Sequence, residues 1–88
     1  MTKNTIMVNV TIPRAIGEST SFTLEINSTV LSVIEKLNQP VLKDKIMRND
    51  YEFNQFSLIY VNDRRIKDSQ IQLTSDTDIE IIIPMAGG

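Results

Sequence analysis

The sequence predicts an α+β domain in which a mixed sheet of about five strands packs against one main helix. Three observations support this prediction. Residues 5–12 and 78–83, near the two ends of the chain, alternate apolar and polar side chains as strands do. The length of 88 residues suits a single domain. Between the two alternating segments, four apolar residues have the spacing of one helical face: Val30, Val33, Ile34 and Leu37.

The first two predicted strands form a hairpin. In residues 5–12 the inward side chains are all β-branched: Ile6, Val8, Val10 and Ile12. Pro13 cannot donate a hydrogen bond to a sheet and is expected to end this strand. Residues 14–19, which contain Gly17, are predicted to form the turn. The second strand then places Phe22, Leu24 and Ile26 inward.

The predicted helix begins after residues that suit a helix cap. Asn27, Ser28 and Thr29 carry side-chain oxygens that can accept hydrogen bonds from the first free amides. Pro40 lacks an amide hydrogen, so it either ends this helix or opens a second short helical segment through Ile46. The polar residues 49–55 are predicted to form a loop.

Three further strands are predicted in the second half. Residues 56–61 form the third strand, Asn62-Asp63 a tight turn, and residues 64–67 a short return strand. Residues 68–77 are expected to wrap as a loop before the last strand, 78–83, which Pro84 ends. This order is that of a β-grasp fold, in which the last strand lies centrally beside the first. The domain is therefore predicted to span residues 1–83, with residues 84–88 as a flexible tail.

The composition excludes several classes of function. The chain has no cysteine, which removes disulfides, thiolate zinc sites and iron–sulfur ligation. It also has no histidine, the commonest general base and metal ligand. The carboxylates and lysines that remain form no catalytic motif. We therefore expect neither a metal site nor an enzyme that acts alone.

Charge and hydropathy argue against nucleic acid and membrane as partners. The nine Lys and Arg residues are dispersed and the net charge is −2, whereas nucleic-acid-binding domains cluster basic residues on one face. No apolar run approaches the ~18 residues of a membrane span, and the N-terminal residues lack the apolar core of a signal peptide. The expected compartment is the cytoplasm.

The C-terminal sequence Pro84-Met85-Ala86-Gly87-Gly88 is predicted to carry the chemistry. Two of the three glycines in the chain are its last two residues. Glycines have no Cβ, so they make a thin segment that fits a narrow channel of a partner enzyme. With Gly88 as the natural C-terminus, its carboxylate can react there with ATP to give an acyl-adenylate. Sulfide can then displace AMP to leave a thiocarboxylate, or an amine can take the acyl group. The alternative is a frayed end without a function.

Several residues in the second half together carry a resemblance to a known family. They are the hairpin 59–66 (Ile-Tyr-Val-Asn-Asp-Arg-Arg-Ile), Leu73, and residues 76–88 with their isoleucine-rich strand and Pro-x-Ala-Gly-Gly end. This pattern resembles the ubiquitin-like β-grasp sulfur carriers, such as the molybdopterin synthase small subunit and the thiamine-pathway sulfur carrier. The chain length and the segment 40–55 look more like the molybdopterin type. One departure is Asn62-Asp63, where the family frequently has Asn-Gly.

The resemblance implies a carrier and not an enzyme. An adenylating enzyme of the ubiquitin-activating type would use ATP to activate Gly88, with Gly87 as its slender neighbour, and the chain itself would bind no cofactor. A synthase, of the type of the molybdopterin synthase large subunit, would then accept the sulfur. Molybdopterin biosynthesis is the first expectation, and thiamine or another thiolation pathway is the alternative within this class. The alternatives outside it are a ubiquitin-like modifier conjugated to lysines through Gly88, and a docking domain whose Gly-Gly end is incidental.

A partner surface is predicted on the outer face of the sheet. Side chains that alternate with the inward ones are expected to form one exposed apolar patch there: Met7, Leu58, Tyr60 and Ile82. Met85 is expected to contact the partner's channel. The alternatives are that residues 40–55 cover this face, or that the third strand has the opposite register and exchanges its faces.

Overall fold

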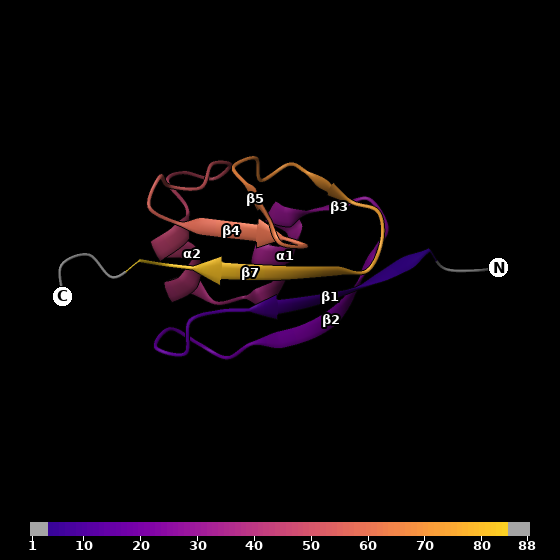
Figure 1. Ribbon diagram of the computed structural model, residues 1–88, viewed down its shortest axis with the longest axis horizontal. Coiled ribbons are helices and arrows are strands. Elements are labelled where there is room, and N and C mark those ends of the chain that lie inside the picture. Colours follow the sequence, from indigo (N-terminus) through magenta and orange to yellow (C-terminus); the bar gives the residue numbers. More distant parts are fainter. Residues whose placement is uncertain (1–3, 85–88) are drawn as a thin grey trace.

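The computed structural model describes residues 4–84 of the chain. Within this range a mixed five-stranded sheet has both helices packed on one of its faces (Figure 1). The elements, in chain order, are β1 (Thr5–Thr11), β2 (Thr20–Glu25), β3 (Ser28–Thr29), α1 (Val30–Leu37), α2 (Pro40–Ile46), β4 (Leu58–Val61), β5 (Arg64–Ile66), β6 (Gln72–Leu73) and β7 (Thr77–Ile82). The strand order in the main sheet is β2-β1-β7-β4-β5. The predicted α+β class and the sheet of about five strands are confirmed.

The first hairpin follows the predicted alternation. In β1 every second side chain is buried, and β2 pairs with it antiparallel through Ile6↔Leu24 and Val8↔Phe22. The prediction that Ile26 faces inward is wrong, because 37% of this side chain is exposed. The strand ends at Glu25, and Asn27 takes a positive φ of 71° that turns the chain away from the sheet.

The last strand occupies the centre of the sheet, as the β-grasp order predicts. β7 runs parallel to β1, with Val10 opposite Ile79, and antiparallel to β4, with Ile59 opposite Ile81. A central strand has ladder hydrogen bonds along both edges. Pro84, the last described residue, comes two residues after the end of this strand, and β7 therefore ends at the opposite edge of the sheet from the start of β1.

The two helices meet at a left-handed residue. In α1 the side chain of Thr29 accepts a hydrogen bond from the Ser32 amide at 3.1 Å, which caps the helix. The helix ends at Asn38 with a φ of 52°, and α2 then begins with Pro40 at its first turn. The predicted main helix is therefore present, and of the two alternatives at Pro40 the structure has the second, in which this residue opens a short helical segment through Ile46. This helix buries Leu42 and Ile46 completely.

A second, two-stranded sheet was not predicted. β3 and β6 pair antiparallel through Ser28↔Leu73 and Thr29↔Gln72. The predicted loop 68–77 therefore includes the short strand β6. Ser28 and Thr29, which were expected only to cap the helix, also form the short strand β3. Backbone bonds extend this contact, from the Asn27 amide to the Leu73 oxygen at 2.8 Å and from the Val30 amide to the Ile71 oxygen at 3.1 Å.

The core lies between the sheet and the helices. It consists almost entirely of aliphatic side chains from β1, α1, α2, β4, β6 and β7: Ile6, Val8, Val10, Ile12, Val30, Val33, Ile34, Leu42, Ile46, Ile59, Leu73, Ile79 and Ile81. The predicted inward faces of the first and last strands are therefore confirmed for Ile6, Val8, Val10, Ile12, Ile79 and Ile81.

Candidate functional site

The residues predicted to carry the chemistry follow the central strand. Gly87 and Gly88 lie outside the described residues, as does Met85. The structure does describe what holds the strand that leads to them. Ile79 and Ile81 of β7 are 1% and 2% exposed, and both neighbouring strands pair with it. The chain before the tail is thus anchored by the core and by two ladders.

Three of the predicted partner residues come together beside the end of β7. Leu58 lies directly opposite Ile82, and Tyr60 is on the same face of β4, two residues further on. Ile82 is 38% exposed, and Leu58 and Tyr60 are half-buried. We call Leu58, Tyr60 and Ile82 the exit patch, because they lie on the outer face where the last strand ends. The alternative register, which would have turned these two β4 side chains inward, does not occur.

The structure does not bring Met7 to this patch. Val8 pairs with Thr77, so Met7 lies level with Asp76, and its amide donates a hydrogen bond to the Asp76 carboxylate at 2.9 Å. Asp76 is six residues before Ile82, which at ~3.3 Å per residue corresponds to about 20 Å along the strand. Met7 is 45% exposed. The prediction of one continuous apolar patch is therefore wrong, since alternation fixes the face of a side chain but not its position along the strand.

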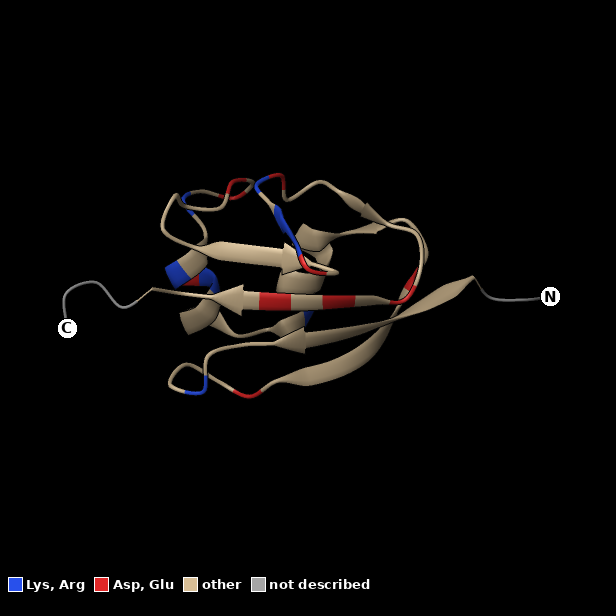
Figure 2. Cartoon of the chain, in the orientation of Figure 1, with Lys and Arg blue, Asp and Glu red and all other residues tan. Residues whose placement is uncertain are grey.

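Acidic side chains occupy the outer face between Met7 and the exit patch. Asp78 and Glu80 of β7 are both exposed there, and acidic residues are visible along this strand in Figure 2. Asp78 accepts a hydrogen bond from the Asn9 side chain at 2.9 Å, and Glu80 lies opposite Tyr60. A shallow hollow of about 220 Å³ on this face also includes Asp63. The alternation of the last strand already indicates that Asp78 and Glu80 point outward.

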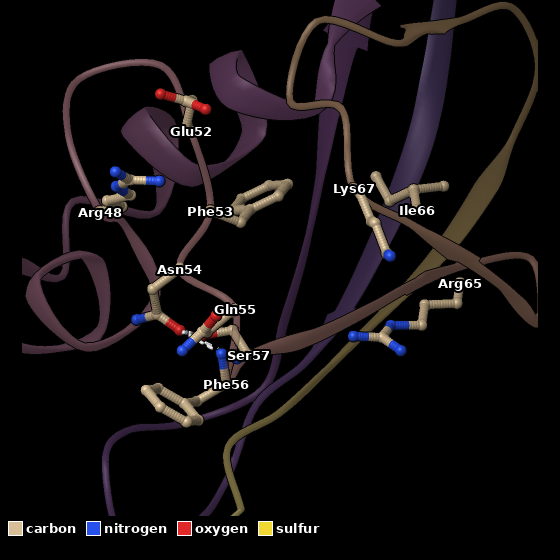
Figure 3. Close-up of a pocket in the computed structure, with 10 residues that line it drawn as sticks. All are labelled: Arg48, Glu52, Phe53, Asn54, Gln55, Phe56, Ser57, Arg65, Ile66 and Lys67. Carbon is tan, nitrogen blue, oxygen red and sulfur yellow. Dashed lines mark hydrogen bonds between the residues drawn. The ribbon is translucent and has the colours of Figure 1, made fainter.

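A larger hollow, of about 640 Å³, lies between the segment 48–57 and the end of β5 (Figure 3). We call it the basic hollow. Its lining includes charged and aromatic side chains from both segments: Arg48, Glu52, Phe53, Phe56, Arg65 and Lys67. Arg65 lines it whereas Arg64, its neighbour in the sequence, does not. The sequence offered no signal for this hollow, because its two walls are separated in the chain and meet only in the fold.

Two features are absent from the part of the chain that the structure describes. In residues 4–84 no group of three or more His, Cys, Asp or Glu side chains is placed to hold a metal ion. In the same part of the chain no helix is both long and apolar enough to cross a membrane.

Comparison with solved structures identifies the fold class. SAMP1 from Haloferax volcanii has a TM-score of 0.75 and 12% identity, over 93% of this chain and 99% of that one. A putative molybdopterin converting factor, subunit 1, from Pyrococcus furiosus has a TM-score of 0.68 and 16% identity, over 91% and 99%. A chain of the BexX/CysO complex from Amycolatopsis orientalis has a TM-score of 0.67 and 24% identity, over 92% and 99%.

These likenesses extend over almost the whole of each chain. The protein therefore has the ubiquitin-like β-grasp fold, and the predicted resemblance to the ubiquitin-like sulfur carriers is confirmed at the level of fold. The structural neighbours are small proteins of nearly the same length. No protein-family model and no curated protein matches the sequence.

Proposed function

We propose that this chain is a sulfur carrier that acts through the carboxylate of Gly88. The observation that supports this proposal most is that the Gly-Gly end follows the central strand of a ubiquitin-like β-grasp sheet within a few residues in the sequence. A central strand holds the base of the tail rigidly, so a partner can align the carboxylate by binding the folded domain. The chain is then a co-substrate and not a catalyst, and no cofactor is bound by it.

The proposed chemistry proceeds in three steps in the cytoplasm. An adenylating enzyme uses ATP: a carboxylate oxygen of Gly88 attacks the α-phosphorus, forming the acyl-adenylate and releasing pyrophosphate. Sulfide from a donor then attacks the acyl carbon and expels AMP, which leaves a thiocarboxylate. A synthase takes the sulfur, and hydrolysis returns the carboxylate. Gly87 leaves the reacting carbonyl sterically open, because it has no Cβ.

The first pathway we propose is molybdopterin biosynthesis. It is supported by the likeness to the molybdopterin converting factor subunit, and the synthase would then be of the molybdopterin large-subunit type. The BexX/CysO complex contains a chain of this fold together with another protein, which fits a carrier that works on a partner. Thiamine formation or another thiolation pathway uses the same end chemistry and is the alternative within this class.

A second candidate function is protein modification. SAMP1 is a small archaeal modifier protein, and its fold matches this chain with a TM-score of 0.75. Modification requires the same adenylation and differs only in the acceptor, which is a lysine amine in place of sulfide. The two functions therefore predict different products at the same Gly88 carboxylate.

The deciding experiment is intact mass spectrometry of the protein isolated from its native cells. A carrier shows a mass increase equal to the exchange of one carboxylate oxygen for sulfur, localised by fragmentation to Gly88. A modifier shows isopeptide remnants of Gly88 on lysines of other proteins. Appending one alanine after Gly88 is expected to abolish either product, whereas appending one alanine before Met1 is the matched control and leaves it intact. Finding only the free acid with the activating enzyme, ATP and sulfide supplied would refute sulfur carriage, and the absence of Gly88 remnants on lysines would refute modification.

A further inference from the structure

The walls of the basic hollow are fixed by backbone contacts. An isolated antiparallel bridge joins Met47 to Phe53, and a second joins Glu52 to Asp68 beyond the end of β5. The Arg48 amide donates to the Glu52 oxygen at 2.7 Å. These contacts tie the segment between α2 and β4 to the β5 side of the sheet. The hollow is thus part of the fold and not a gap beside a loose loop.

The side chain of Asn54 holds the backbone at the rim of the hollow, from which the ring of Phe56 projects. Its side-chain oxygen accepts hydrogen bonds from the Phe56 amide at 3.0 Å and from the Ser57 amide and hydroxyl, both at 2.9 Å. Its side-chain nitrogen donates to the Lys45 oxygen at 2.5 Å. The backbone of Phe56 is therefore held in place, while its ring is 69% exposed. An exposed aromatic side chain on a fixed backbone is a low-entropy contact for a partner.

The charge of the hollow is opposite to that of the whole chain. Three cationic side chains, Arg48, Arg65 and Lys67, line it, against the single carboxylate of Glu52. That carboxylate accepts a hydrogen bond from the Asn49 side chain at 2.7 Å. Arg65 and Lys67 extend into the hollow from one side, and Arg48 lies across it (Figure 3). In a chain of net charge −2 this is a local excess of positive charge.

The hollow also lies beside the exit patch. Arg65, which lines the hollow, pairs with Tyr60 of the exit patch across β4 and β5. Ser57, another lining residue, directly precedes Leu58, which pairs with Ile82. A protein that binds the exit patch brings its surface to the hollow as well.

We propose that the basic hollow binds an acidic segment of a partner protein, with an apolar residue of that segment against Phe56. Several carboxylates spaced along an extended segment can reach both Arg48 on one wall of the hollow and Arg65 and Lys67 on the other. Arginines bind carboxylates with two parallel hydrogen bonds. A small anion would need donors that converge on one point, whereas these are spread around about 640 Å³. The identity of the partner as the enzyme that activates Gly88 rests on the proposed function. The acidic character of the bound segment rests only on the charges that line the hollow.

The test is an NMR titration of the full chain with a short synthetic peptide of Asp and Glu residues around one Leu. Its control is the same peptide with Asn and Gln in place of the acids. The acidic peptide is expected to shift the amide signals of Arg48, Phe56 and Lys67, more strongly at low salt, because exposed charges are screened by salt. The neutral peptide is expected to leave them in place. The titration needs no activating enzyme, so its result is independent of the chemistry at Gly88.

Matched variants locate the site. Arg65→Glu is expected to weaken peptide binding about tenfold, because it turns attraction into repulsion at the wall of the hollow. Arg64→Glu makes the same change of charge on the same strand outside the hollow, and is expected to alter binding by less than about twofold. Both variants are first checked for the dispersion of NMR signals that a folded domain gives. Phe56→Ala removes the aromatic contact without changing the charge, and is expected to weaken peptide binding as well.

Three results would overturn the proposal. The first is equal shifts with the neutral peptide. The second is equal weakening by Arg64→Glu, which would mean a general charge effect. The third is inorganic phosphate shifting the same amides with the same affinity, which would mean a small-anion site.

Discussion

Two adjacent residues of β7 provide the sharpest test of the sheet's two faces. Ile81 is 2% exposed and belongs to the core, whereas Ile82 is 38% exposed and belongs to the exit patch. Replacing either by alanine removes the same carbon atoms from the same strand. Any difference between Ile81→Ala and Ile82→Ala therefore measures the environment of the side chain and not strand propensity.

The magnitudes follow from burial. Isoleucine to alanine removes about three methyl or methylene groups, which at ~0.8 kcal/mol each gives about 2.4 kcal/mol for a fully buried side chain. At Ile81 the enclosed cavity adds to this cost, so we expect about 3 kcal/mol. At Ile82 somewhat under two-thirds of the side chain is buried and solvent fills the space, so we expect at most about 1.5 kcal/mol.

The assay is urea unfolding followed by circular dichroism, together with thermal melting. For a domain of this size each kcal/mol lowers Tm by roughly 4–8 °C, so Ile81→Ala should lower it by roughly 12–24 °C and Ile82→Ala by no more than about half of that. The slope of the unfolding free energy against urea concentration (the m-value) should be the same in both variants, because the surface area exposed on unfolding hardly changes. An equal cost for the two variants, or a larger one for Ile82→Ala, would show that the faces of β7 are assigned wrongly.

The remaining predictions concern the helix cap, the hairpin turn and the exit patch. Thr29→Ala removes the cap on the Ser32 amide and is expected to cost about 1 kcal/mol in urea unfolding, whereas Thr29→Ser should restore most of it. Asp63 has a φ of 69°, so Asp63→Ala is expected to cost about 1 kcal/mol and Asp63→Gly less; equal costs would contradict the left-handed turn. Ile82→Glu is expected to weaken binding to the activating enzyme at least about tenfold in calorimetry, while Met7→Glu, about 20 Å away, should not.

The sequence predicted those parts of the fold that depend on a periodic pattern. The alternation of 5–12 and the helical spacing from Val30 to Leu37 each produced the expected element, because burial of one face imposes that period. The central place of the last strand followed from the order of the elements. The missed β3 and β6 are only two residues long, and a pairing that short has no period to detect.

The site was predictable only in part, for a geometric reason. Leu58, Tyr60 and Ile82 share a face and lie together, as alternation suggested, but Met7 lies at the other end of the sheet. Its distance from the others depends on the register of β1 against β7, which no local pattern contains. The basic hollow was missed because its walls come from two segments that the bridge between Glu52 and Asp68 brings together.

The position of β7 between β1 and β4 also determines how the domain responds to mechanical load. A force that pulls Pro84 away from Asn4 acts along the strands, because β1 and β7 are parallel, Asn4 precedes the start of β1 and Pro84 follows the end of β7. The ladder hydrogen bonds run across the strands, perpendicular to the force between β7 and β4 and slanted between β7 and β1, so they must break together in shear and not one after another. If the chain has the proposed function, the activating enzyme can therefore pull on the tail without peeling the last strand from the sheet.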